Sequence, residues 1–416
     1  MILELKCIRP FAFLILLVLL SCQETVESEI KTPSDIVDGL EQLQEKWDSS
    51  AISGFGIAVV RNDSIVYSGG IGYADIERGL PYTNRTVQPL GSISKVFTAT
   101  AIAKGIELGY FGLQTPINGV LPFEIHNPHD PDRIIRLFDL VTHSSGILDS
   151  DEYFWKHAYC FDEDNDRVTG SKHLAEVHFA KNGDCGSLAA LMSGLFNKEG
   201  KWYHESNFAF GDSIRYNYSN AATALAGYIV EHKSGMPFHA FCKQHIFVPL
   251  GMKQTTFVKQ EVSKEDAAIL YYDKETPLPV YYLSSYPDGG LCTSPNDLAI
   301  YLREMMRGYR GESDLLKQST FDLMFSKKFD QNNLPLDLPP SSNSGIFWDW
   351  MKSGRLGHNG SDPGLFTWMD IDTENNTGML ILLNHGLMYD DENRRILLGQ
   401  LKGFVKELRE MEKGGD

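Results

Sequence analysis

The chain has 416 residues and a formal net charge of −17 at pH 7, because 55 Asp and Glu outnumber 38 Lys and Arg. Apolar residues make up 42% and charged residues 22%, which is typical of a globular protein and excludes global disorder. The acidic balance excludes a general phosphate-binding surface, so we expect no nucleic-acid partner. The length allows one large domain, or two interwoven ones, with a substantial core.

The first residues are typical of an export signal. Two basic residues, Lys6 and Arg9, precede the apolar run Phe11–Leu20. This run is too short to span a bilayer, which needs about 20 residues, but it has the length of the apolar part of a secretory signal peptide. We therefore predict a signal peptide at 1–21 and an exported protein.

The residues that follow resemble a bacterial lipobox. The stretch Leu19-Leu20-Ser21-Cys22 implies that Cys22 is lipidated and becomes the mature N-terminus, which would anchor the protein to a membrane of the bacterial cell envelope. Residues 22–33 are polar and acidic, as expected of a tether. The alternative is a plain signal peptide that happens to contain a cysteine.

The remaining residues, 34–413, are predicted to form one domain of mixed helices and strands. In chain order we expect a helix capped by Ser34, strands at 54–60 and 64–68, a helix from 92 to about 108, a short amphipathic segment at 134–141, helices at 221–233 and 297–306, strands at 364–370 and 377–383, and a helix at 391–413. Residues 149–213 are polar, aromatic and irregular. Strands at both ends with helices between them predict an α+β core with a helical region inserted between its halves.

Six cysteines are too few for a disulfide scaffold, and none forms a Cys-x-x-Cys motif. Cys160 and Cys185 share one polar stretch and are a possible disulfide pair, because an oxidising compartment permits the bond. Cys242 and Cys292 lie in apolar contexts and are interpreted as buried thiols.

The sharpest chemical signal is Ser92-Ile93-Ser94-Lys95. Residues three apart share a helix face, so the Lys95 amine would lie beside the Ser92 hydroxyl and could accept its proton. The apolar helix that follows would bury Lys95, and burial lowers the pKa of a lysine. The alternative is a capping serine with a surface lysine one turn later.

Two further motifs are weak when taken alone. Tyr218-Ser219-Asn220 precedes an alanine-rich helix, and there a phenol can shuttle a proton while an amide binds substrate. The alternative is an ordinary turn with Asn220 as helix cap. The stretch 357–361, Gly-His-Asn-Gly-Ser, precedes a predicted strand, where small residues let a substrate backbone approach closely. The alternative is a glycine-rich turn.

Together and in this order, the three motifs resemble those of the serine β-lactamase and penicillin-binding-protein superfamily. The likeness is nearest to the class C branch, which includes DD-carboxypeptidases, D-aminopeptidases and esterases. It extends to the stretches 90–99, 140–147, 249–252 and 289–294, and it runs from about residue 35 to 410. The resemblance implies a β-lactamase-like fold, with an antiparallel sheet flanked by N- and C-terminal helices and a mainly helical inserted region.

The resemblance also implies roles for the motif residues. Ser92 would be the acylated nucleophile, and Lys95 would take part in its deprotonation. Tyr218 would transfer a proton to the leaving group and would also act in deacylation. Asn220 would orient the substrate. The main-chain N–H groups of Ser92 and Ser361 would form the oxyanion hole.

The chain departs from the family pattern in two ways. His358-Asn359-Gly360 stands where many relatives carry Lys-Thr-Gly. A histidine is mostly neutral at pH 7, so it is a weaker partner for a substrate carboxylate, and efficient β-lactamase activity becomes less expected. The region 149–213 is longer than the family needs, and we interpret it as a lid-like insertion.

We therefore predict a serine hydrolase that acts on peptides or amides containing a D-amino acid, with no cofactor and no metal. One alternative is a carboxylesterase for small esters. Another is a catalytically idle lipoprotein that binds cell-wall peptides. The sequence does not predict the oligomeric state.

Overall fold

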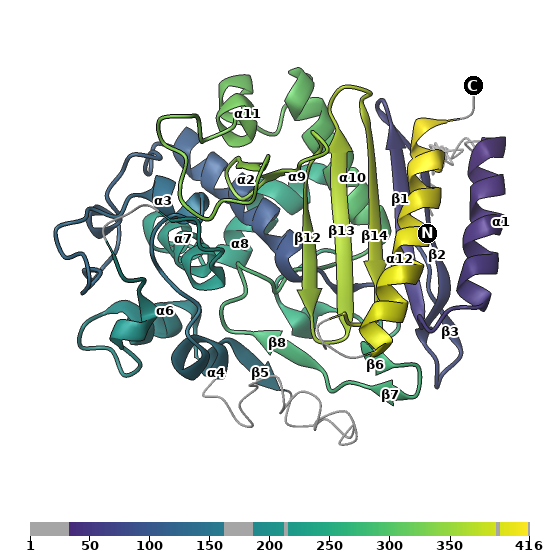
Figure 1. Ribbon diagram of the computed structural model, residues 1–416, viewed down its shortest axis with the longest axis horizontal. Helices are drawn as coiled ribbons and strands as arrows, with labels where there is room; N and C mark the ends of the chain where they lie inside the picture. The colour runs from purple at the N-terminus through teal and green to yellow at the C-terminus, as the bar shows by residue number, and fades with distance from the viewer. Residues whose placement is uncertain (1–32, 162–185, 212–214, 388–391, 415–416) are drawn as a thin grey trace, which may run out of the picture. The chain divides into compact units, whose positions relative to one another are not determined.

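The computed structural model describes residues 33–161, 186–211, 215–387 and 392–414. Its centre is an eight-stranded antiparallel sheet in the order β10-β11-β12-β13-β14-β1-β2-β3 (Figure 1). In that order the strands are Asn343–Ser344, Asp349–Trp350, Leu356–Asp362, Leu365–Asp372, Thr377–Leu383, Gly54–Arg61, Ser64–Asp75 and Leu80–Pro81. The first long strand, β1, therefore pairs with the last one, β14, from Phe55↔Leu383 to Arg61↔Thr377.

Both faces of the sheet are covered by helices. Helices α1 (Ser34–Asp48) and α12 (Glu392–Lys413) pack on one face, and α10 (Pro295–Arg310) packs on the other. Along β1, Ile57 and Val59 enter the core beneath α1 and α12, whereas Ala58 and Val60 enter the larger core on the opposite face. Alternate residues point to opposite sides of a strand, so an almost continuously apolar strand fits this buried position.

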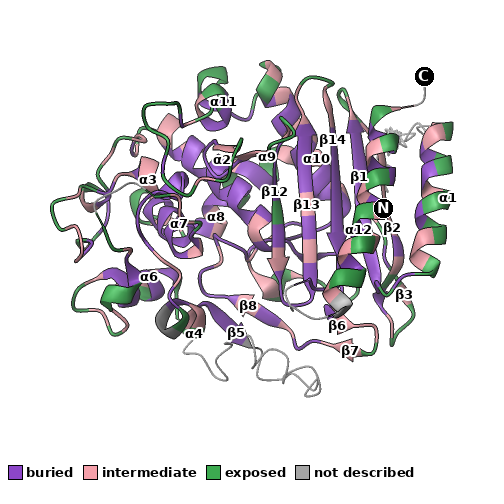
Figure 2. Cartoon of the chain, in the orientation of Figure 1, coloured by how far each residue is buried: buried purple, intermediate pink, exposed green. Residues whose placement is uncertain are grey.

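The helical region adjoins the larger core. Figure 2 shows α2 (Ser94–Glu107) and α7 (Asn220–Ser234) buried along most of their length, and the two helices pack against each other. The other α-helices among the described residues are α3 (Leu137–Val141), α4 (Lys156–Ala158), α6 (Leu188–Phe196), α8 (Phe238–Cys242), α9 (Val248–Leu250) and α11 (Gln318–Phe325). The short strand pairs are β4 (Gln88–Pro89) with β9 (Cys292–Thr293), β5 (Tyr159–Phe161) with β8 (Tyr281–Leu283), and β6 (Tyr271–Asp273) with β7 (Thr276–Pro277).

The predicted α+β architecture and its flanking terminal helices are confirmed. Strand β2 is longer than predicted, because its pairing with β1 continues to Gly72. The predicted cap of α1 is wrong, and so is the alternative in which Asn220 caps α7. Pro33, not Ser34, precedes the first turn of α1, and Ser219, not Asn220, caps α7 by accepting a hydrogen bond from the Ala222 N–H at 2.9 Å.

The described parts of the region 149–213 pack into the larger core. Phe154, Leu191, Phe196 and Phe208 are each at most 2% exposed. Residues 162–185 lie outside the described part of the chain, and the lid-like role stays a prediction.

The cysteine predictions are confirmed where the structure describes them. Cys160 is disulfide-bonded, and its predicted partner Cys185 lies outside the described residues. Cys242 and Cys292 are buried free thiols. Cys22 also lies outside the described residues, and among the helices that are described none is both long and apolar enough to cross a membrane.

Candidate active site

Ser92 lies where β4 turns into helix α2. It occupies a single 3₁₀ turn, Gly91–Ile93, and is half-buried, and Lys95 follows in the first turn of α2. Gly91 has φ +56°, and a Cβ atom there would lie 3.3 Å from both the Ser361 N atom and the Asp362 Oδ2 atom. A residue without a side chain therefore brings the nucleophile segment close to strand β12.

The Lys95 amine is held by three acceptors. Its Nζ atom donates to the Ser92 Oγ atom at 3.0 Å, to the Asn220 Oδ1 atom at 2.6 Å and to the main-chain oxygen of Asp288 at 2.8 Å. The two carbonyl oxygens can only accept hydrogen bonds, so the two hydrogens that point at them stay on Nζ. When Lys95 loses a proton, its lone pair therefore points at the Ser92 hydroxyl, as a general base requires.

The protonation of Lys95 is set by two opposing effects. The side chain is 0% exposed, and burial lowers the pKa of its ammonium group. Nearby acidic groups, led by Asp288 and followed by Asp149 and Asp362, raise it when they are ionised. Burial prevails and the pKa lies below its usual value, which makes the neutral form more accessible near neutral pH.

Tyr218 lies over the same amine. Its ring centroid is 4.9 Å from Lys95 Nζ, although 40% of the residue is exposed. The enclosed surroundings of the hydroxyl raise the pKa of Tyr218 well above its usual value, while a hydrogen bond from Ser92 lowers it. The phenol is therefore protonated at neutral pH and can give a proton to a leaving group.

Asp149 fixes the start of helix α7 and, with it, Asn220. Its carboxylate accepts from the Ser219 hydroxyl at 3.1 Å, from the main-chain N–H groups of Asn220 and Ala221 at 2.9 and 2.8 Å, and from the Asn220 side-chain amide at 2.8 Å. A carboxylate at a helix N-terminus satisfies donors that have no partner within the helix. The amide of Asn220 is thereby oriented with its oxygen toward Lys95.

Strand β12 passes directly beside the nucleophile. A Cβ atom on Gly360 would lie 2.1 Å from the Leu90 carbonyl oxygen and 2.9 Å from the Ser92 N atom. Only a glycine allows this approach. The main-chain N–H groups of Ser92 and Ser361 thus belong to neighbouring segments. An oxyanion hole formed by these two groups requires this arrangement.

His358 lies on the same strand and is 3% exposed. Its Nδ1 atom is 2.6 Å from the Asn359 carbonyl oxygen, which can only accept, so the ring proton is on Nδ1. The Nε2 atom is 3.9 Å from Asp349 Oδ2. Burial lowers the pKa of His358, Asp349 raises it and Lys95 lowers it, and the net shift is downward.

The structure thus brings together Ser92, Lys95, Tyr218, Asn220, His358, Gly360 and Ser361, all of which the sequence analysis predicted. It adds acidic residues that the sequence analysis did not assign: Asp149, Asp288, Asp349 and Asp362. It also adds His143, whose Nδ1 atom accepts from the Ser219 N–H at 3.1 Å and whose ring centroid lies 4.6 Å from that of Tyr218. One usable signal was present, because Asp288 directly precedes a Gly-Gly-Leu stretch that carries part of the family likeness.

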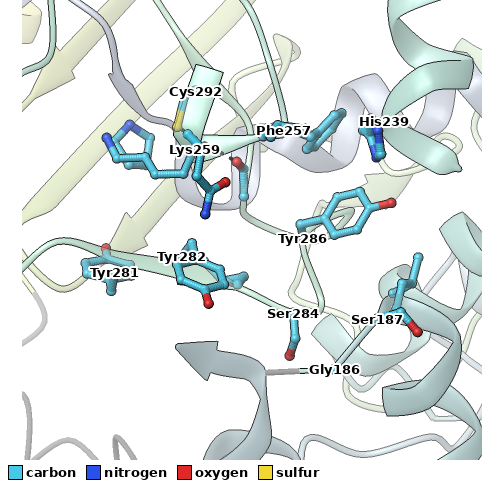
Figure 3. A pocket seen from close by; sticks show the side chains of 16 residues that line it. Gly186, Ser187, His239, Phe257, Lys259, Tyr281, Tyr282, Ser284, Tyr286 and Cys292 are labelled. Atoms are coloured by element: carbon cyan, nitrogen blue, oxygen red, sulfur yellow. Dashed lines mark hydrogen bonds between the residues drawn. The ribbon is translucent and has the colours of Figure 1, made fainter. Parts of the chain in front are cut away.

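A separate pocket of about 200 Å³ is shown in Figure 3. The aromatic side chains that line it are Phe257, Tyr281, Tyr282 and Tyr286. None of the three predicted catalytic side chains lines this pocket, so we do not assign the chemistry to it.

The chain matches a known protein family. The family model described as "Beta-lactamase" matches residues 41–401. The putative penicillin-binding protein PbpX of Bacillus subtilis is 23% identical over 391 residues, which cover 93% of this chain and 81% of PbpX. Esterase EstB of Burkholderia gladioli is 25% identical over 257 residues, 56% of this chain and 59% of the esterase. A β-lactamase of Pseudomonas fluorescens is 26% identical, over 67% of this chain and 66% of that enzyme.

Solved structures share the fold. The octameric penicillin-binding protein homologue from Pyrococcus abyssi matches with a TM-score of 0.65 and 24% identity, over 89% of this chain and 77% of that one. The penicillin-binding protein from Bacillus halodurans matches with a TM-score of 0.61 and 19% identity, over 87% and 98% of the two chains. At these identities the likeness concerns the fold alone.

Proposed function

This chain belongs to the beta-lactamase family, and from that premise we propose that it is a serine hydrolase that forms an acyl-enzyme at Ser92. The observation that carries the proposal is the arrangement around Lys95. Two of its three hydrogens are committed to carbonyl oxygens, and the third direction points at the Ser92 Oγ atom, 3.0 Å away.

In the proposed acylation, the Ser92 Oγ atom forms a bond to the substrate carbonyl carbon while its proton passes to Lys95 Nζ. The oxyanion accepts hydrogen bonds from the Ser92 and Ser361 N–H groups. Tyr218 protonates the leaving atom as the carbonyl–leaving-group bond breaks, and its phenolate then regains a proton from the Lys95 ammonium, which lies against the face of its ring. Water then hydrolyses the ester at Ser92 by the reverse proton transfers.

The substrate class that we propose first is a peptide or amide that contains a D-amino acid. The family likeness supports it, because relatives with histidine in the position of His358 include DD-carboxypeptidases and D-aminopeptidases. A carboxylesterase acting on small esters is the second candidate. It is favoured by the lowered pKa of His358, since a neutral imidazole does not require a substrate carboxylate, and by the match to an esterase.

The test is intact-mass spectrometry of the purified protein mixed in turn with a penicillin, a D-Ala-D-Ala peptide and an activated ester. We expect an adduct or turnover that disappears in Ser92→Ala, and the fastest reagent separates peptidase from esterase. The absence of both adduct and turnover with every reagent would contradict the proposal and favour the idle peptide-binding protein.

We further propose that the protein is exported and anchored through a lipid on Cys22. The support is the order of a basic segment, a short apolar run and a lipobox-like stretch. Expression in a bacterium fed an alkyne-labelled fatty acid should label the wild type, and Cys22→Ala should stay unlabelled. Equal labelling of the two proteins would contradict the proposed lipid anchor at Cys22.

A further inference from the structure

His358 and Lys95 are two side chains of the active site that could offer a positive charge to a substrate. His358, which stands where relatives have a lysine, is buried with its ring proton on Nδ1 and its pKa lowered. Lys95 is fully buried and gives its three hydrogens to protein acceptors. Neither group therefore offers a free positive charge to a substrate at neutral pH.

The strongest charge effects on Lys95 come from four carboxyl groups: Asp288, Asp149, Asp362 and Asp349. Three of them are occupied or enclosed. Asp149 accepts four hydrogen bonds at the start of α7, and Asp288 and Asp362 are 2% and 7% exposed. The side chain of Asp349, in contrast, is 38% exposed, so its carboxylate faces solvent.

Asp349 also lies close enough to act on two residues of the candidate site, His358 and Tyr218. It lies on β11, opposite Gly357 in the pairing with β12, and its Oδ2 atom is 3.9 Å from His358 Nε2. Its charge also acts on Tyr218, the proposed proton donor to the leaving group. A partly exposed carboxylate thus stands next to the position where a lysine would meet a substrate carboxylate.

We propose that Asp349 selects the charge of the leaving group, favouring a leaving group that carries an ammonium ion and opposing one that carries a carboxylate. The inference rests on the proposed function and specifies its substrate class. Opposite charges across a partly desolvated site favour binding, and like charges oppose it.

The test uses three aryl esters of N-acetyl-D-alanine whose leaving phenols carry a meta substituent: trimethylammonium, carboxamide or carboxylate. Their chemical reactivities differ, so the informative quantity is the ratio of kcat/KM in the wild type to that in Asp349→Asn for each ester. We expect this ratio to be about 10 for the cationic ester, about 1 for the neutral ester and about 0.1 for the anionic ester. Asp349→Glu should keep the wild-type order.

Asp38→Asn is the matched control, because Asp38 is an exposed carboxylate on α1 and the change removes the same net charge. It should leave all three ratios near 1. Ser92-dependent turnover in which Asp349→Asn alters the three esters by one common factor would overturn the inference while leaving the proposed function intact. No turnover of any ester, together with no adduct at Ser92, would overturn both.

Discussion

The Lys95 ammonium donates to the main-chain oxygen of Asp288 at 2.8 Å, while the side-chain Oδ2 atom of Asp288 is buried with no hydrogen-bond partner among the described residues. The main-chain oxygen of Asp288 therefore accepts a hydrogen bond from the proposed base, Lys95. Its side-chain carboxyl group is instead buried nearby. Burial raises the pKa of this carboxyl to about 8, against the opposing effect of Lys95.

This enclosure predicts that Asp288→Asn stabilises the protein increasingly as pH rises. Between about pH 4 and 8 the unfolded chain has an ionised Asp288, while the folded protein keeps the proton. The folded state thus binds more protons, so the wild type loses stability as pH rises through this window, and the asparagine does not. Melting temperatures at pH 5, 6, 7 and 8 should show a widening gap; a constant gap would mean that the carboxyl is not enclosed as described.

Removal of the proposed base should strongly slow acylation. We expect Lys95→Ala to reduce the acylation rate with an activated ester by about 10²–10⁴, the usual contribution of general base catalysis. Lys104→Ala is the control, because Lys104 is on the same helix and pairs with Glu107 at 3.2 Å. Stopped-flow kinetics measures the acylation rates of the wild type and the two variants. A Lys95→Ala rate within threefold of the wild-type rate would refute the role of Lys95 as the base.

The close approach of β12 to the nucleophile predicts that a single methyl group is disruptive. In Gly360→Ala the new Cβ would collide with the Leu90 carbonyl oxygen and lie 2.9 Å from the Ser92 N atom, so β12 must move away. We expect kcat/KM to fall at least about 100-fold, as for the loss of an oxyanion-hole donor. Gly399→Ala on α12 meets no atom within 4 Å and should leave activity unchanged. Equal activities of the two variants would argue against the oxyanion geometry.

The carboxylate of Asp149 predicts a combined loss of stability and activity. Asp149→Ala leaves four donors at the start of α7 without their acceptor, and it frees the Asn220 amide. We expect the free energy of unfolding to fall by about 2–4 kcal/mol, since charged hydrogen bonds are worth about 1.5–3 kcal/mol each and do not add fully. Urea denaturation measures the change. Asp151→Ala, an exposed neighbour, should cost less than about 0.5 kcal/mol.

The parts of the site that follow local rules could be predicted from the sequence. Ser92 and Lys95 are three residues apart at the start of a helix, so their contact follows from helical geometry. Strands β13 and β14 and helix α10 were predicted in the same way, from periodicity and turn residues.

What could not be predicted depends on contacts between distant parts of the chain. The Lys95–Asp288 hydrogen bond joins residues 193 positions apart, and Asn220 reaches Lys95 across 125 positions. Asp149 lies in a stretch that is otherwise merely polar, and the Asn220 side chain does not cap α7 because its oxygen accepts from Lys95 and its amide donates to Asp149. Such choices are made by packing and burial, which a single sequence does not display.

The pairing of β1 with β14 has a consequence for how the protein is made. Strand β1 leaves the ribosome more than 300 residues before its partner, so the first hairpin of a nascent chain waits with one edge unpaired until synthesis is almost complete. Such non-local pairing makes folding slow. Under the proposed mechanism, a chain that stops before β12 carries the nucleophile and its base but not the Ser361 donor. Catalytic activity would therefore report that translation has reached the last strands of the sheet.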